Sequence, residues 1–454
     1  MEMKKILYAS LALLLMATGC TKTSPSDGDS DNADDLLTEP ATGWKRVAII
    51  PFDGLGGGAT PYNAMKGFDL QKANGQFAVL YTQHSLEPVA HVSSDYFYKT
   101  VVSENATATN LQKISFGIFS GGGNSSPFTW YGQLLPNSVI PVFTGMDYNN
   151  NYIQLRNSTG DIIAGAPASN YPTFKYTNDG TFLAGSMWTG HESFLWHYKN
   201  PPDPIGDFSA TYRPGVIEGH KRLFNIPVKA ADGNYYEFSL CSKDGATTFM
   251  VIRCREDRTY GATPPNYEIV DAGTVANMPQ SGFPADFLEL LTYDYNTETG
   301  EITFVFDDFQ SAASGSDARK NIYCYRWRQG SLTRLWQASL DQDADFSNAV
   351  KVYINKNMLN EWRLKPDGTL YTMARFEANV PQPADPAIKL WEVNNSGVKV
   401  ISSITYGQTV QKDFTLSTCR YLDGAYYALA YPTGDGRYRI GDPHYHMEIV
   451  KLNP

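Results

Sequence analysis

Aromatic side chains beside polar segments are the clearest candidates for ligand chemistry in this sequence. Trp130 and Tyr131 are adjacent, and Trp188 and Trp196 lie on either side of His191. The flat faces of Trp and Tyr stack on sugar rings or aromatic chelators and can supply much of a binding energy. The competing interpretation is that these rings pack between sheets. We treat Trp130, Tyr131, Trp188, His191 and Trp196 as candidate ligand-binding residues.

Motifs for hydrolytic chemistry are incomplete. His191-Glu192 begins like the zinc-protease motif H-E-x-x-H, but Leu195 stands where the second His belongs. Asp307 and Asp308 are adjacent, so on a strand they point to opposite faces and cannot act on one substrate. No G-x-S-x-G nucleophile motif occurs. The sequence therefore predicts no catalytic residue, and it favours binding over catalysis while leaving enzyme activity open.

Metal- and cofactor-binding patterns are also partial. His444 and His446 would share one face of a strand, but no third zinc ligand accompanies them. Residues 341–345 open like a calcium loop, yet Phe346 replaces the glycine that an EF-hand needs. Gly54–Ala59 matches the G-x-G-x-x-A dinucleotide fingerprint, but no βαβ pattern surrounds it. We expect no metal site and no cofactor.

The N-terminus carries an export signal. Lys4 and Lys5 precede an apolar run from Ile6 to Ala17, which is shorter than the roughly 20 residues of a membrane-spanning helix. The run ends in Ala-Thr-Gly-Cys, with Cys20 last, and this ending resembles the lipobox of bacterial lipoproteins. The resemblance implies that residues 1–19 are a signal peptide and that Cys20 is lipidated. It also implies an anchor in the outer membrane, on the cell surface or on the periplasmic face.

The segment after Cys20 reads TKTSPSDGDSDNADDLLTEPATG and has six acidic residues against one Lys. Such a composition cannot bury enough apolar surface to fold, so we expect residues 20–43 to be a disordered acidic tether. The whole chain of 454 residues has a formal net charge of −10. Without a basic cluster, it is not expected to bind nucleic acid.

From residue 44 onward the sequence predicts an all-β body. Short aromatic and β-branched runs alternate with Gly, Asp, Asn or Pro. One strand-like segment recurs seven times, at Phe77–Gln83, Asn151–Asn157, Ser193–Lys199, Phe249–Arg255, Asn321–Arg328, Ile388–Asn394 and His446–Leu452. Seven copies favour a seven-bladed β-propeller over residues 44–454, with six or eight blades, or β-sandwich domains, as alternatives. Trp44–Phe52 would pair with His446–Leu452 and close the ring. A closed ring without exposed edges is expected to be a monomer.

Asp-Gly pairs precede aromatic strands at several places, and they suit tight hairpin turns. The pair Asp244-Gly245 predicts that Cys241 lies opposite residue 248 and Cys254 opposite residue 235. A disulfide within this hairpin is therefore not expected. The sequence leaves open the oxidation state of the four cysteines outside the lipobox, Cys241, Cys254, Cys324 and Cys419.

The lipobox resemblance and the propeller fold together predict a lipid-anchored extracytoplasmic binding protein. It would capture a small ligand, a glycan or a metal chelate, beside an outer-membrane transporter. One alternative is a glycan-cleaving hydrolase or lyase that uses carboxylates or His191 on the central face. Another is an envelope scaffold that binds a protein partner through an apolar patch.

Overall fold

The structure is a computed structural model of the chain. The residues that it describes are 44–52, 65–87, 92–119, 128–132, 134, 140–145, 151–157, 162–168, 172–176, 182–187, 193–198, 209–213, 216–229, 234–254, 267–275, 289–296, 298–307, 321–347, 362–376, 387–405, 414–432 and 446–452. Cys20 and the segments predicted to be the signal peptide and the tether lie outside these ranges. Among the residues in these ranges, no helix is long and apolar enough to cross a membrane.

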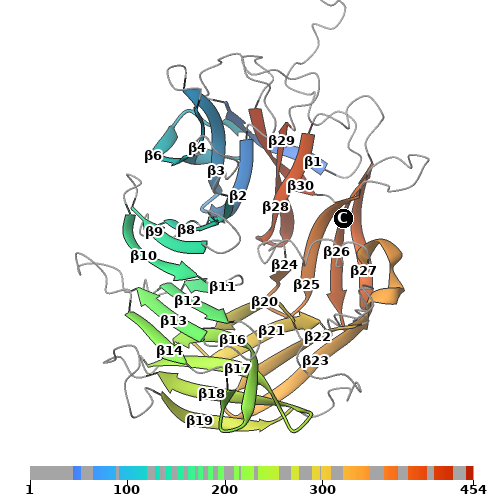
Figure 1. The fold of residues 1–454 in the computed structure, drawn as a ribbon. Coiled ribbons are helices and arrows are strands. Elements are labelled where there is room, and N and C mark those ends of the chain that lie inside the picture. The colour runs from blue at the N-terminus through green and yellow to red at the C-terminus, as the bar shows by residue number, and fades with distance from the viewer. Residues whose placement is uncertain are drawn as a thin grey trace, which may run out of the picture.

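The described residues form antiparallel sheets that follow one another around a common centre in chain order (Figure 1). The first sheet contains β2 (Met65–Ala73), β3 (Gln76–Glu87), β4 (Val92–Ser103) and β6 (Leu111–Phe119). The second contains β7 (Phe128–Gly132), β8 (Ile140–Gly145), β9 (Asn151–Arg156) and β10 (Ile162–Ala168). The third contains β11 (Pro172–Tyr176), β12 (Phe182–Met187), β13 (Ser193–Tyr198) and β14 (Ser209–Arg213).

The next three sheets repeat this order. The fourth contains β15 (Val216–Ile217), β16 (His220–Lys229), β17 (Tyr235–Lys243), β18 (Ala246–Cys254) and β19 (Tyr267–Thr274). The fifth contains β20 (Glu289–Asn296), β21 (Glu301–Asp307), β22 (Asn321–Arg328) and β23 (Ser331–Ser339), which runs into the 3-10 helix η3 (Leu340–Gln342). The sixth contains β24 (Trp362–Leu364), β25 (Leu370–Phe376), β26 (Ala387–Asn394) and β27 (Gly397–Thr405).

The seventh sheet joins the two ends of the body. Its order is β28 (Phe414–Leu422), β29 (Ala425–Pro432), β30 (His446–Leu452), β1 (Trp44–Pro51) and β5 (Ala106–Thr107). β1 pairs antiparallel with β30, from Trp44 opposite Leu452 to Pro51 opposite His446. The prediction that the strand at residues 44–52 closes the ring beside the last strand is therefore confirmed.

The predicted all-β propeller class is confirmed, because the sheets succeed one another radially, with β2, β11, β16, β20, β24 and β28 toward the centre (Figure 1). β-Sandwich domains, the alternative fold, do not describe this arrangement. The number of blades stays a prediction, since parts of the body lie outside the described ranges.

The recurring segment marks one particular strand in most of the ring. Six copies lie on β9, β13, β18, β22, β26 and β30, each of which is the third strand of its sheet when the two-residue β15 of the fourth sheet is left out of the count. The copy at Phe77–Gln83 instead lies on β3, the second strand of the first sheet. β3 and β4 are both long and rich in aromatic residues, so composition does not separate them.

The hairpin register around Asp244-Gly245 is confirmed. Cys241 lies opposite Thr248, and Cys254 lies opposite Tyr235. Asp244 and Gly245 both have positive φ, at 52° and 78°, as a tight two-residue hairpin turn requires. Cys241, Cys324 and Cys419 are buried free thiols.

Antiparallel pairing gives the sheets two distinct ends. At the end that we call the turn end, the first strand joins the second and the third joins the fourth. In the fifth, sixth and seventh sheets these joints are short, at residues 297–300, 329–330, 365–369, 395–396 and 423–424. At the opposite end, which we call the long end, the same sheets are joined by residues 308–320, 340–361, 377–386, 406–413 and 433–445. The third and fourth sheets differ, because residues 199–208 join β13 to β14 and residues 255–266 join β18 to β19. Both are long joints at the turn end when β16 is counted as the first strand of the fourth sheet.

Candidate functional site

Two of the predicted ligand-binding residues lie on β7, the first strand of the second sheet. The pairing of β7 with β8 shifts between Thr129 and Tyr131, so Trp130 occupies an irregularity in the ladder. Such a bulge changes the direction of a side chain relative to regular alternation. Tyr131 lies opposite Phe143. The backbone thus places Trp130 and Tyr131 on a strand near the centre, while their side chains lie outside the described part.

The other predicted ligand-binding residues lie on or next to the third sheet. Trp196 is in the middle of β13, opposite Ala184 on β12 and Ala210 on β14. Trp188 and His191 lie outside the described residues, between β12 and β13. Trp196 is on a third strand and Trp130 is on a first strand, so the described backbone does not gather the predicted residues into one site.

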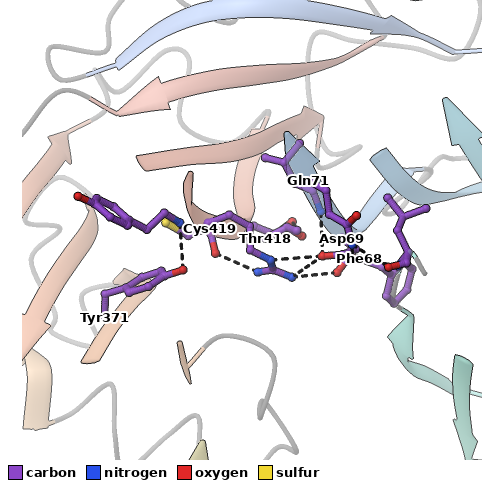
Figure 2. Close-up of polar contacts among 11 residues, drawn as sticks. Phe68, Asp69, Gln71, Tyr371, Thr418 and Cys419 are labelled. Atoms are coloured by element: carbon purple, nitrogen blue, oxygen red, sulfur yellow. Dashed lines mark hydrogen bonds and ion pairs between the residues drawn. The ribbon is translucent and has the colours of Figure 1, made fainter. Parts of the chain in front are cut away.

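A buried ion pair joins the seventh sheet to the first (Figure 2). The Asp69 carboxylate, on β2, accepts hydrogen bonds at Oδ1 from Arg420 Nε at 3.3 Å and Nη2 at 3.1 Å. Arg420 lies on β28, and both residues are buried. Oδ1 also accepts from the backbone N–H of Leu70 at 3.0 Å. The two first strands that meet at this contact are therefore held by a charge-assisted pair.

The second carboxylate oxygen of Asp69 reaches toward the second sheet. Oδ2 accepts from the backbone N–H of Leu134 at 2.9 Å and from Gln71 Nε2 at 3.1 Å. Gln71 Nε2 also donates to the Leu134 carbonyl at 2.7 Å. Leu134 follows β7 in the chain. One carboxylate therefore ties together elements of the seventh, first and second sheets.

The Arg420 guanidinium also donates hydrogen bonds to two backbone carbonyls. Nη1 donates to the Cys419 carbonyl at 2.9 Å, and Nη2 donates to the Phe68 carbonyl at 3.4 Å (Figure 2). Because both carboxylate oxygens and the guanidinium are engaged, the pair has no group ready for acid–base chemistry. We refer to Asp69, Gln71, Leu134 and Arg420 as the seam cluster.

Backbone irregularities place the seam cluster. The register of β2 shifts between Gly67 and Asp69, and that of β28 shifts between Ser417 and Arg420. Thr418 within the second irregularity has a φ of 57°. At Gly67 an added Cβ would lie 2.4 Å from Leu429 Cδ1, so any larger residue would require Leu429 to shift at this contact of the two sheets.

Lys72, on β2 of the first sheet, contacts the β28–β29 hairpin of the seventh sheet. Its Nζ lies 2.7 Å from Glu104 Oε1 and 3.5 Å from Asp423 Oδ2. It also donates to the Tyr427 hydroxyl at 3.1 Å and lies 4.9 Å from the centroid of that ring. Hydrogen bonding to Glu104, followed by that to Tyr427, raises the pKa of Lys72 above its ordinary value.

Lys365, which follows β24 of the sixth sheet, contacts the same hairpin. Its Nζ lies 4.2 Å from the ring centroid of Tyr421 and 4.9 Å from that of Tyr426, and it pairs with Glu392. The Tyr426 hydroxyl donates to the same Glu392 carboxylate. Burial, and then the Glu392 hydrogen bond, raises the pKa of Tyr426, so this hydroxyl keeps its proton. The backbone N–H of Tyr421 donates to Tyr371 Oη at 3.0 Å (Figure 2).

Two more buried carboxylates are matched by cations within sheets. Glu237 on β17 pairs with Arg222 on β16, and both side chains are fully buried. Glu448 on β30 lies 3.5 Å from Arg46 on the closing strand and 3.0 Å from His446 Nε2. The imidazole of His446 thus faces a carboxylate, whereas His444 lies outside the described ranges.

The side chains of the aspartates at 343 and 345 have structural contacts. Asp343 Oδ1 accepts from the backbone N–H of Phe346 at 2.8 Å, which caps the short helical turn there. Asp345 pairs with Lys389 of the sixth sheet. No group of three or more His, Cys, Asp or Glu side chains that could hold a metal ion occurs within the described ranges.

Comparison with known proteins places this arrangement among distant structural relatives only. The chain matches no protein-family model and no curated protein. It is similar to the polysaccharide lyase Uly1, with a TM-score of 0.40 and 8% identity over 92% of this chain and 98% of that one. The β-propeller domain of the Trilobed protease from Pyrococcus furiosus gives a TM-score of 0.39 and 8% identity over 82% and 91%. An alpha-L-arabinanase from Penicillium chrysogenum gives 0.31 and 10% over 91% and 98%. Similarity at this level carries no argument about ligand or reaction.

Sequence reasoning missed the seam cluster. Asp69 and Arg420 are 351 positions apart, so no local spacing connects them. The one available signal was a lone charge within an otherwise apolar strand, as in Gly67-Phe68-Asp69-Leu70. Burial of such a charge requires a partner, but the sequence does not say which one.

Proposed function

We propose that this protein is a binding protein whose ligand site lies at the long end of the ring. The observation that carries the proposal is the asymmetry of the fifth, sixth and seventh sheets. Residues 308–320, 377–386 and 433–445 join second to third strands at the long end, whereas joints at the turn end are much shorter. Binding residues are concentrated on long connections that a rigid scaffold positions.

The described polar groups support binding more than catalysis. Three of the four buried acidic residues, Asp69, Glu237 and Glu448, pair with arginines. Such pairs fix the geometry of a scaffold and occupy the carboxylates with arginine side chains, whereas a catalytic acid or base has to reach the substrate. The ligand class that we propose is a small glycan or a metal chelate, stacked on Trp130, Tyr131, Trp188 or Trp196 with His191 nearby.

We further propose that residues 1–19 are a signal peptide, that Cys20 carries lipid and that residues 20–43 form the tether. The chain would then sit at the outer membrane as a monomer, on the cell surface or the periplasmic face, beside a transporter. Replacing Cys20 by Ser should move the protein from the membrane fraction to the soluble fraction. Retention of the Cys20→Ser variant in membranes would contradict this part of the proposal.

A thermal-shift screen tests the binding function. The chain from residue 20 onward, carrying Cys20→Ser, is melted with glycans, ferric chelates and divalent metals in turn. A ligand that binds only the native state at 100 times its Kd stabilises it by about 2.7 kcal/mol, which gives a saturable rise in Tm. Trp130→Ala should reduce that rise, while the exposed Val101→Ala should not. A flat response to every class would contradict small-ligand binding.

The same samples distinguish binding from cleavage. Oligosaccharides recovered after incubation are analysed for shorter or unsaturated products. Intact oligosaccharide together with a saturable Tm rise agrees with the proposal, whereas turnover would establish a hydrolase or lyase instead.

A further inference from the structure

The closing strand enters the ring at the turn end. Trp44, the first residue of β1, lies opposite Leu452, and Leu452 lies opposite Tyr426 on its other side. Tyr426 is the second residue of β29, which begins directly after the tight turn at 423–424. β1 then runs toward the long end, where Pro51 lies opposite His446. Any segment that precedes residue 44 therefore reaches the body beside the short turns.

β1 is held along both of its edges. β30 pairs with one edge, and β5, which lies between β4 and β6 in the chain, pairs parallel with the other. The backbone N–H of Asn105 donates to the Val47 carbonyl at 2.6 Å, and that of Ala108 donates to the Ile49 carbonyl at 2.8 Å. Because the strand is clamped on both sides, its first residue is a fixed point of the ring.

The position of this fixed point affects how the ring lies on the membrane, because the proposed tether is about as long as the ring is high. An unfolded segment as long as residues 20–43 has an r.m.s. end-to-end distance of about 27 Å. A strand of the length of β1 spans roughly 26 Å from the turn end to the long end. To turn the long end toward the anchor, the tether would have to use about its whole r.m.s. length in spanning this height, which leaves little for the gap between the body and the bilayer.

We infer that the turn end of the ring faces the lipid bilayer and that the long end points away from it. The inference rests on the proposed lipidation of Cys20 and adds the orientation of the proposed ligand site. It commits to a lipid surface as the partner of the turn end. The long connections would then be open to ligands arriving from the side opposite the membrane.

Two positions on one sheet allow a matched test. Ser396 is exposed in the turn at 395–396, at the turn end of β27. Ser403 is exposed near the other end of the same strand, roughly 23 Å away at strand spacing. Cys241, Cys324 and Cys419 are buried and should not take up a thiol label. Replacing Cys254 by Ser removes the remaining thiol of the body.

The experiment uses the acylated protein in vesicles that contain nitroxide-headgroup phospholipid. A fluorophore is attached at Ser396→Cys or Ser403→Cys in the Cys254→Ser background. We expect at least twofold stronger quenching at position 396 than at position 403. Equal quenching, or stronger quenching at position 403, would overturn the orientation.

Two further measurements keep the anchor and the orientation separate. Mass spectrometry of the purified chain determines whether Cys20 is acylated, and an unacylated chain would overturn both proposals. An acylated chain with equal quenching overturns the orientation alone. Duplicating residues 21–43 lengthens the tether about 1.4-fold in r.m.s. distance, so the difference between the two positions should shrink. An unchanged difference would contradict the tether-length argument.

Discussion

The contact between the seventh and first sheets and the contact between the fourth and fifth sheets are built from different side chains. At the first contact, Asp69 and Arg420 form a buried ion pair, and Lys72 packs on Tyr427. At the second, Phe304 lies within ring-stacking distance of several other aromatic side chains, namely Phe224, Phe238, Phe306 and Tyr325. The aromatic side chains can bury apolar surface in many packing arrangements, whereas the ion pair forms in only one register of the two sheets.

The difference fits the positions of the two contacts in the chain. The fourth and fifth sheets are consecutive, so their connection already limits how they meet. The seventh and first sheets hold the two ends of the body and must find each other across the ring. A buried charge pair penalises wrong registers because an unpaired buried charge is costly. We interpret the seam cluster as the element that specifies closure, and the following variants test that interpretation.

The largest effect is expected for Arg420→Ala. It leaves the Asp69 carboxylate buried without its cation, which should lower the free energy of unfolding by about 3–5 kcal/mol in urea titrations. Arg328→Ala is the matched control, because that side chain is 59% exposed and should cost less than about 0.5 kcal/mol. The double variant Asp69→Leu/Arg420→Met removes both charges and should recover most of the loss. If the double variant is as unstable as Arg420→Ala, the unpaired charge is not the cause.

Phe304→Ala tests the aromatic contact. The fully buried ring leaves a cavity, so the free energy of unfolding should fall by about 3–4 kcal/mol. Phe304→Leu keeps most of the volume and should cost less than about 1.5 kcal/mol. Tolerance of Leu here, set against the large loss expected for Arg420→Ala, would sharpen the contrast. A large loss in Phe304→Leu would break it.

Gly67→Ala tests how closely the seventh and first sheets approach. The added methyl would meet Leu429, and relief of that clash should cost about 1–3 kcal/mol in thermal or urea unfolding. In the background of Leu429→Ala the same substitution should cost much less. Equal costs in the two backgrounds would show that Leu429 does not set the spacing.

Lys72→Met tests the contacts that Lys72 makes with the β28–β29 hairpin. Loss of its ion pairs and its contact with the Tyr427 ring should cost about 1 kcal/mol, less at high salt. Because the folded pKa of Lys72 is raised, its contribution is fully present below its ordinary pKa of 10.5 and is lost only as pH rises above that. Stability measured at pH 6 and pH 8 should therefore show the same difference from the parent chain. Lys45→Met, at an exposed site on β1, is the control.

The smallest effect concerns the thiols on the aromatic side of the ring. Burial raises the pKa of Cys241 from 9.0 to about 12 and also raises that of Cys324. Both should react with a thiol reagent at pH 8 only after unfolding. The raised pKa also means that their contribution to stability is lost as pH rises from about 9 toward 12. Rapid labelling of Cys241 or Cys324 in the folded chain would contradict their assigned burial.

Local patterns in the sequence predicted much of this fold, because they depend on neighbouring residues. The Asp244-Gly245 turn fixed the register of its hairpin, and the strand at 44–52 was assigned to the edge of the last strand. The seam cluster was not predictable in the same way. Its members come from distant strands with bulges in both, and a bulge depends on the sheet that the strand meets. The candidate ligand residues stay predictions for the same reason, since distant segments must bring them together.

The clamped closing strand also has a consequence for the order of folding. Arg46 on β1 meets Glu448 on β30 at a separation of 402 positions, so β1 cannot be placed until nearly the whole chain has been synthesised. Contacts between residues so far apart in the sequence form slowly, because the entropy of closing the intervening loop is lost before the contact contributes any stability. Until β30 has been made, the edge of β1 that it covers stays unpaired and prone to aggregation, as exposed strand edges are. β1, the strand of the body that is synthesised first, is therefore the last strand to pair in the ring.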